Sequence, residues 1–229
     1  MNHEHHLKSS DTIRDIVIGM SDGLTVPFAL AAGLSGASAH SGIVVTAGIA
    51  EIVAGSIAMG LGGFLAGKTE SDHYASELQR EYEEVERVPE QEKMEVKEVF
   101  ANFGLSEKLQ NEVADEMAKD KDKWVDFMMK YELGLEKPEE NRARQSAITI
   151  GISYIVGGII PLSPYFFVDD SQRALYYSCA ITMVCLFVFG YFKSKVTGQP
   201  PFSGALKVLI IGALAAAAAF GMAKLINGR

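Results

Sequence analysis

The sequence has little of what most enzyme active sites require. It contains 2 cysteines, Cys179 and Cys185, six positions apart in one apolar run, which places them on different faces of a helix. Packing is therefore the expected role of both thiols. The chain has no CxxC pair, no glycine-rich phosphate loop and no recognisable nucleophile triad. These absences argue against thiol-redox, nucleotide-hydrolysing and nucleophilic enzymes.

Basic residues are too few for a nucleic-acid partner. The chain has 21 lysines and arginines against 29 aspartates and glutamates, a formal net charge of −8. Because phosphate binding needs a basic face, we expect no nucleic acid among the partners. Most of the acidic residues fall within residues 68–144, where apolar residues are spaced out. This stretch is predicted to be a soluble insertion.

Long apolar runs make up most of the remaining chain. Each is close to 20 residues, enough to span roughly 30 Å of hydrocarbon as a helix. They lie near residues 16–36, 42–66, 146–167, 174–192 and 203–226. We predict an all-α membrane protein with five transmembrane helices, two within residues 13–67 and three within residues 145–229. The first run is too long and too interrupted for a cleavable signal peptide.

The distribution of lysine and arginine predicts the orientation of these helices. Basic residues precede the first run, follow the second in the insertion and lie between the fourth and fifth. By the positive-inside rule, the amino terminus and the insertion face the cytosol and the carboxy terminus faces the opposite side. The polar tail, residues 1–12, contains His3, His5 and His6. We expect disorder there, with weak metal collection as the alternative.

A carboxylate stands inside the second apolar run. Glu51, Gly55, Met59 and Gly63 recur every fourth residue and so form one stripe on a helix. A charge at membrane depth costs at least about 3 kcal/mol unless it meets a polar pathway or a partner. Met59 adds a thioether, which favours softer divalent transition metals over Mg²⁺ or Ca²⁺, although such a residue can also simply fill a packing gap. Glu51 is therefore a candidate for ion transport.

The first run contains a second carboxylate, Asp22, flanked by Gly19 and Gly23. Glycines at this spacing allow two helix backbones to approach closely. At 1.5 Å per residue, Asp22 and Met59 are expected at a similar depth, with Glu51 about 12 Å further from the cytosol. Metal and protons could compete for the two carboxylates, which would couple opposite fluxes.

The insertion is predicted to hold three helices. The first continues the second apolar run and breaks at Val88 and Pro89, the second covers residues 90–100, and the third runs from Ser106 to Tyr131. Glutamates three apart share a helix face and could build a carboxylate metal site between helices, although a solvated acidic face is the more usual role of such residues. Spacing does not select the ligands among the many glutamates present.

Two segments resemble the vacuolar iron transporter family, in particular its plant members. They are SDGLTVPFALAAGLSGA at residues 21–37 and AEIVAGSIAMGLGGFLA at residues 50–66. The resemblance extends over nearly the whole chain. It implies a five-helix fold, a homodimer with the pathway between the two first helices, and export of ferrous iron from the cytosol into the vacuole in exchange for protons.

The resemblance also implies roles for particular residues. Asp22, Glu51 and Met59 match the family's pathway residues, and Tyr154 is implied as a further one. The residues implied to collect metal in the inserted cytoplasmic domain are Glu81, Glu84, Glu92, Glu95, Met128 and Glu132. Fe²⁺ would be the substrate, with Co²⁺, Mn²⁺, Zn²⁺ and Ni²⁺ as further candidates, and no prosthetic group is expected.

Two other classes of protein remain open. One is a membrane-anchored metal sensor or buffer, in which the insertion binds metal but nothing crosses the membrane. The other is a membrane-bound carboxylate metalloenzyme, for which histidine ligands beside the glutamates would be expected. His73 is the histidine nearest to them, and it is not part of an E-x-x-H motif.

Overall fold

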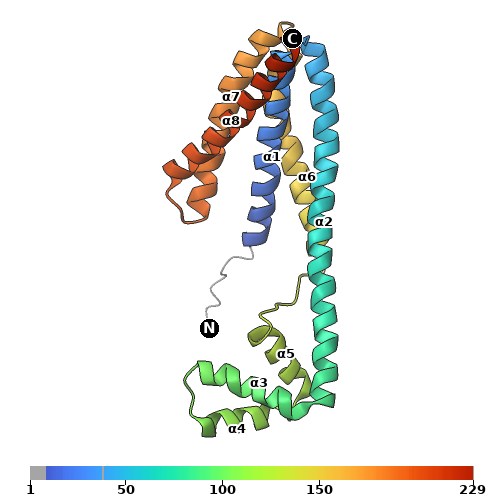
Figure 1. Cartoon of the computed structure of the whole chain (residues 1–229), viewed down its shortest axis with the longest axis vertical. Coiled ribbons are helices and arrows are strands. Elements are labelled where there is room, and N and C mark those ends of the chain that lie inside the picture. The colour runs from blue at the N-terminus through green and yellow to red at the C-terminus, as the bar shows by residue number, and fades with distance from the viewer. Residues whose placement is uncertain (1–8, 38, 229) are drawn as a thin grey trace. The chain divides into compact units, whose positions relative to one another are not determined.

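The computed structural model describes residues 9–37 and 39–228, and all regular structure within these residues is helical (Figure 1). The elements are α1 (Ser9–Gly36), α2 (Ser41–Arg87), α3 (Pro89–Asn102), α4 (Glu107–Met117), α5 (Lys121–Tyr131), α6 (Arg142–Leu162), the 3-10 helix η1 (Ser163–Phe166), α7 (Ser171–Val196) and α8 (Pro201–Asn227). Among the described residues, 5 helical segments are long and apolar enough to cross a membrane. The all-α class and the five predicted spans are confirmed.

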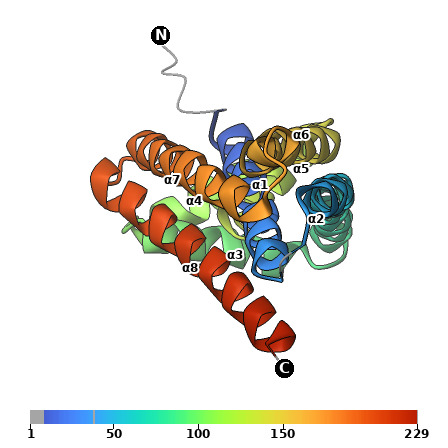
Figure 2. The ribbon, with the colours of Figure 1, turned by 90° about the horizontal axis from the view of Figure 1, so that it is seen from above.

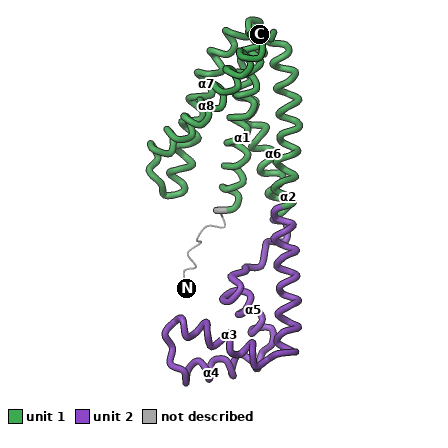
Figure 3. The backbone as a smooth tube through the Cα atoms, viewed as in Figure 1, with its two compact units in different colours: residues 1–65, 143–229 green, residues 66–142 purple. Residues whose placement is uncertain are grey.

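The chain divides into two compact units (Figure 3). The membrane unit comprises Met1–Leu65 and Ala143–Arg229, and the inserted unit comprises Ala66–Arg142. The second unit overlaps the predicted insertion, residues 68–144, whose role as a separate cytoplasmic domain stays a prediction. Most of the predicted histidine-containing tail lies outside the described residues, and α1 already begins at Ser9.

Helix α2 runs without a break from one unit into the other. It has 47 residues, and its charged half after Lys68 contains neither proline nor glycine. It ends where Pro89 opens α3, because a residue before proline is disfavoured in the α conformation. Val88 accordingly has φ −133° and ψ 50°. The predicted break at these two residues is therefore where the helix ends.

In the membrane unit, α1 packs against α7 and α8, which also pack against each other (Figures 1 and 2). Helix α6 packs against α1 through glycines, as the spacing of Gly19 and Gly23 predicts. A Cβ atom at Gly19 would lie 2.8 Å from the Cβ of Ser153, and one at Gly23 would collide with the Tyr154 carbonyl oxygen. The helix pair expected beside Asp22 is thus α1 with α6.

The inserted unit combines the end of α2 with α3, α4 and α5. Its core consists of buried apolar residues from all four helices, namely Val85, Val96, Ala114, Trp124, Val125, Met128 and Met129. The prediction of one helix from Ser106 to Tyr131 is wrong, because α4 ends at Met117 and α5 begins at Lys121. The Asp120 carboxylate caps α5 by accepting a hydrogen bond from the Lys123 backbone N–H at 3.3 Å.

Candidate functional site

Glu51 and Tyr154 meet in the membrane unit. The Tyr154 hydroxyl donates a hydrogen bond to Glu51 Oε1, so a side chain of α6 reaches a carboxylate of α2. Tyr154 is buried with 2% exposure, and Glu51 is half-buried. The second oxygen, Glu51 Oε2, is buried and accepts no hydrogen bond from the described residues. The arrangement holds one carboxylate oxygen and leaves the other available to a cation or a proton.

Glycine contacts with α6 show the relative heights of the other predicted pathway residues. Gly19 of α1 and Gly63 of α2 both face Ile150, while Gly23 and Gly55 both face Tyr154. On α2, Gly60 next to Met59 faces the Ala147 carbonyl oxygen, whereas on α1, Gly23 next to Asp22 faces the backbone of Tyr154. The Asp22 and Met59 side chains are both half-buried. Met59 and Asp22 therefore lie opposite different turns of α6, and the expected shared depth of the two residues is not observed.

Glu51 also lines an open groove beside α1 and α8. The other lining residues are apolar or small with one amide, namely Val26, Ala29, Leu30, Gly33, Leu34, Ala37, Ala219, Ala223, Ile226 and Asn227. On α1, Ala29 and Gly33 stand four residues apart on one face, and Ala37 follows directly after the helix ends. Packing alone does not require a carboxylate beside an apolar groove, so the position of Glu51 indicates a functional role.

The six residues implied to collect metal lie together in the inserted unit. Glu81 at the end of α2 and Glu92 on α3 are each 2% exposed, and Met128 of α5 is fully buried. Glu84 and Glu95, one turn away on the same helices, are half-buried. Within the described part of the chain, neither Glu81 Oε2 nor Glu92 Oε2 has a hydrogen-bond partner. Two buried carboxylates thus keep one free oxygen each.

Burial and mutual repulsion raise the pKa values of two of these carboxyl groups. Burial, followed by the charge of Glu95 and then of Glu81, raises the pKa of Glu92 to about 7. The pKa of Glu132 is also raised to about 7, first by desolvation of its carboxyl group and then by Glu95 and Glu81, although the residue as a whole is exposed. We name these six residues, Glu81, Glu84, Glu92, Glu95, Met128 and Glu132, the carboxylate cluster.

Burial separates Glu81 and Glu92 from neighbouring glutamates with similar spacing. Glu83 and Glu98 are exposed, and Glu83 accepts a hydrogen bond from Gln79 at 2.9 Å. Glu77 pairs with Arg80 at 2.7 Å. For the residues that the structure describes, no three histidine, cysteine or acidic side chains form a ready-made metal site. The cluster is therefore a concentration of carboxylates whose oxygens do not yet converge on one point.

Sequence reasoning missed the cationic neighbour of this cluster. The Arg80 guanidinium lies 3.5 Å from a Glu84 oxygen as well as beside Glu77. The signal was present, because arginine and glutamate four apart on a helix are placed to pair. Arg80 partly offsets the negative charge next to Glu81 and Glu132.

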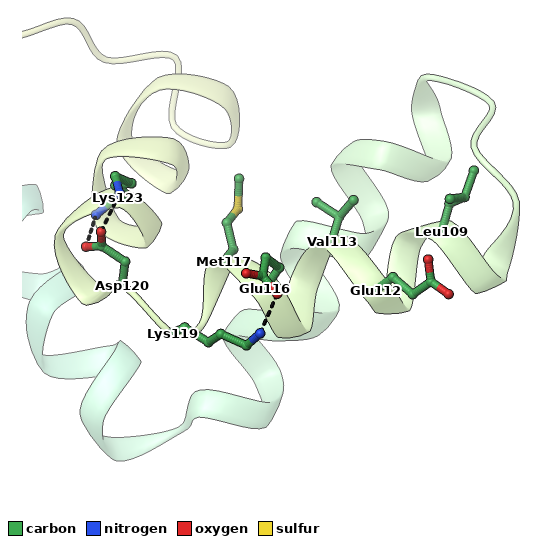
Figure 4. Close-up of a pocket in the computed structure, with 8 residues that line it drawn as sticks. All are labelled: Leu109, Glu112, Val113, Glu116, Met117, Lys119, Asp120 and Lys123. Carbon is green, nitrogen blue, oxygen red and sulfur yellow. Dashed lines mark hydrogen bonds and ion pairs between the residues drawn. The ribbon is translucent and has the colours of Figure 1, made fainter.

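A separate open groove lies along α4 and the start of α5 (Figure 4). Its lining combines an apolar stripe with charged residues, namely Leu109, Glu112, Val113, Glu116, Met117, Lys119, Asp120 and Lys123. The cluster residues do not line it. Four of its charged residues form two internal ion pairs, since Lys119 contacts Glu116 and Lys123 lies 2.7 Å from Asp120. This groove is therefore distinct from the carboxylate cluster.

Comparisons with known proteins identify the family to which the chain is similar. The model of the VIT family matches residues 13–224. Vacuolar iron transporter 1 of Eucalyptus grandis is 54% identical over 224 residues, which cover 98% of this chain and 90% of that protein. The protein of the same name from Arabidopsis thaliana is 53% identical with the same coverage, and that from Tulipa gesneriana is 53% identical over 98% of this chain and 91% of its own length. All three are named as transporters.

Proposed function

The chain belongs to the VIT family, and on this basis we propose that it moves ferrous iron from the cytosol into the vacuole in exchange for protons. It is a transporter and not an enzyme, as the names of its relatives indicate. Its place in the vacuolar membrane follows from the same relatives and from its five apolar helices.

The observation that carries the proposal is the hydrogen bonding of the two carboxylate oxygens of Glu51. A carboxylate inside an apolar helix bundle is held by Tyr154 at one oxygen and keeps the other oxygen buried and available within the described structure. A carboxylate at membrane depth is costly unless it meets a polar pathway or a partner, and the available oxygen of Glu51 is where a transported ion would bind. Asp22 and Met59 would pass the ion to Glu51.

Proton coupling follows from the chemistry of the carboxylates. Metal binds the deprotonated form, so a metal ion and a proton compete for Asp22 and Glu51. Protons from an acidic vacuole would displace the metal there, and metal from the cytosol would displace protons on the other side. The Met59 thioether favours softer divalent ions, so Co²⁺, Mn²⁺, Zn²⁺ and Ni²⁺ are expected to compete with Fe²⁺.

The carboxylate cluster would collect metal on the cytoplasmic side, where the positive-inside rule places the inserted unit. Its free oxygens on Glu81 and Glu92, with the Met128 sulfur, supply donors of the same kinds as the pathway. Because a metal ion would relieve the repulsion among the carboxylates, binding is expected to draw them together.

We further propose that two copies form a dimer through α1. Ala29, Gly33 and Ala37 line an open apolar groove, and small residues of this kind let membrane helices approach closely. A second α1 in this groove would place two copies of Glu51 on opposite sides of one interface.

Uptake of ferrous iron into proteoliposomes with an imposed pH gradient tests the function. The wild type is expected to take up iron only with the gradient, and Asp22→Ala and Glu51→Ala are each expected to reduce uptake at least about tenfold. The paired change Glu92→Ala/Glu95→Ala should reduce uptake at low iron concentration, while its control, Glu83→Ala/Glu98→Ala on exposed positions, should not.

Equal uptake by wild type and Glu51→Ala would contradict the pathway, and uptake unaffected by the gradient would contradict proton coupling. Iron binding by the wild type without uptake would instead indicate a membrane-anchored metal buffer.

A further inference from the structure

Gly55 occupies a special position on α2, one turn from Glu51 and one turn from Met59. A Cβ atom at Gly55 would lie 2.5 Å from the Tyr154 Oη, 2.6 Å from its Cζ and 2.7 Å from its Cε1. Real side chains do not approach this closely, so the phenol ring fills the space that a side chain at position 55 would take. The ring passes over this glycine to reach Glu51 on the next turn.

Tyr154 is fixed from a second side by α1. A side chain at Gly23 would collide with the backbone of Tyr154, which shows that α1 lies directly against this residue. Tyr154 therefore occupies space that is open only because residues 23 and 55 are glycines: its backbone lies against Gly23 and its ring lies against Gly55. Since the backbone of Tyr154 is held by α1, the ring can move away from a side chain at position 55 only by rotating about its own side-chain bonds, which takes the hydroxyl away from Glu51.

We propose that Gly55 is a positioning residue that acts through Tyr154 to present Glu51 to the transported ion with a single free oxygen. The proposal rests on the proposed function of Glu51. Tyr154 takes Oε1 by its hydrogen bond, and Oε2 is left without a partner in the described structure. A carboxylate fixed in this way binds a metal through one oxygen and reaches that geometry without reorganising.

Other glycines of α2 do not have this relation. Beside Gly48 a side chain would meet the methyl end of Leu162, and beside Gly63 it would meet the methyl end of Ile150 at 2.7 Å. Flexible ends of this kind can move aside, whereas the ring of Tyr154 is rigid. Gly62 on the same helix faces open space with nothing within 4 Å, which makes it a matched control.

The test compares Gly55→Ala, Tyr154→Phe, the double variant and Gly62→Ala in the full-length protein. In proteoliposomes, the first two are each expected to raise the apparent KM for Fe²⁺ about tenfold with the maximal rate nearly unchanged, since each loses one hydrogen bond to a charged group. The double variant should be no worse than the poorer single variant. Gly62→Ala should match the wild type. If the increase in apparent KM of the double variant equals the product of the two single increases, the proposal is overturned.

Infrared spectroscopy provides a readout that does not depend on transport. The carboxylate band that disappears in Glu51→Gln should shift in Gly55→Ala and in Tyr154→Phe alike, and should stay in place in Gly62→Ala. An unshifted band in Gly55→Ala overturns the inference even if the wild type transports iron, whereas a shifted band supports it even if the wild type does not.

A folding defect in Gly55→Ala is also informative. In a Tyr154→Ala background the ring is absent, so Gly55→Ala should cause no further loss of thermal stability. An equal loss in that background would mean that position 55 acts on another neighbour, and this too would overturn the proposal.

Discussion

Glu92 holds a proton more tightly in the folded protein than in the unfolded chain. Its pKa rises from 4.5 to about 7, first through burial and then through the charge of Glu95. Between these two values the folded state binds more protons than the unfolded state, so stability falls as pH rises. The stability that the neutral carboxyl group provides is fully present below about pH 4.5 and is lost as pH passes 7.

We therefore predict that the inserted unit melts at a lower temperature at pH 8 than at pH 6 when no metal is present, and that Glu92→Gln flattens this dependence. The measurement can follow the fluorescence of Trp124, the 1 tryptophan of the chain, which is 3% exposed in the core of this unit. Glu98→Gln, at an exposed position, should leave the dependence intact. A melting temperature that rises with pH would contradict the prediction.

At the scale of elements, the junction between α4 and α5 depends on a cap. Asp120 has extended backbone angles of φ −127° and ψ 98°, and its side chain accepts from the Lys123 backbone N–H. Its pKa is held below the usual value, first by its side-chain hydrogen bond to Lys123. The carboxylate is thus charged and placed at the positive end of α5.

Asp120→Ala is predicted to lower the melting temperature of the inserted unit by a few degrees, because a helix that starts without its cap leaves an amide unpaired. The matched control is Lys123→Ala, which removes the ion pair but keeps the backbone N–H. It should have a smaller effect, since exposed ion pairs contribute little. Equal losses in thermal scans would show that the ion pair, and not the cap, matters.

Structural features could be predicted from the sequence where a single physical effect determines them. Hydrocarbon thickness requires long apolar runs, so all five spanning helices could be predicted, and Gly19 and Gly23 indicated the close helix pair. The break at Asp120 could not be predicted, because the apolar spacing continues across it from Met117 to Trp124. Among the glutamates, spacing did not distinguish Glu81 from Glu83, since burial depends on α3 and α5 as well as on α2.

At the scale of the whole molecule, the groove beside α1 must be filled either by lipid or by a second copy of the chain. Val26 lines this groove and is 43% exposed, while the opposite side of α1 is covered by its own chain. Lipid could fill the groove, but lipid gives Glu51 no polar neighbour. A second copy would bring its own Glu51 and Asp22 to the same interface. Two-fold symmetry places a residue near the axis close to its own copy.

Cysteine cross-linking distinguishes these arrangements. In a background with Cys179→Ala and Cys185→Ala, Val26→Cys is predicted to form a disulfide-linked dimer rapidly on mild oxidation in the membrane, because a disulfide needs Cα atoms within about 7 Å. Ile211→Cys on α8, at a position that is 62% exposed, is the control and should remain monomeric. Dimers are separated from monomers by non-reducing electrophoresis. Equal cross-linking at both positions would reflect random collision and contradict the α1 interface, whereas dimers at Val26 alone would place the pathway carboxylates of two chains around one axis.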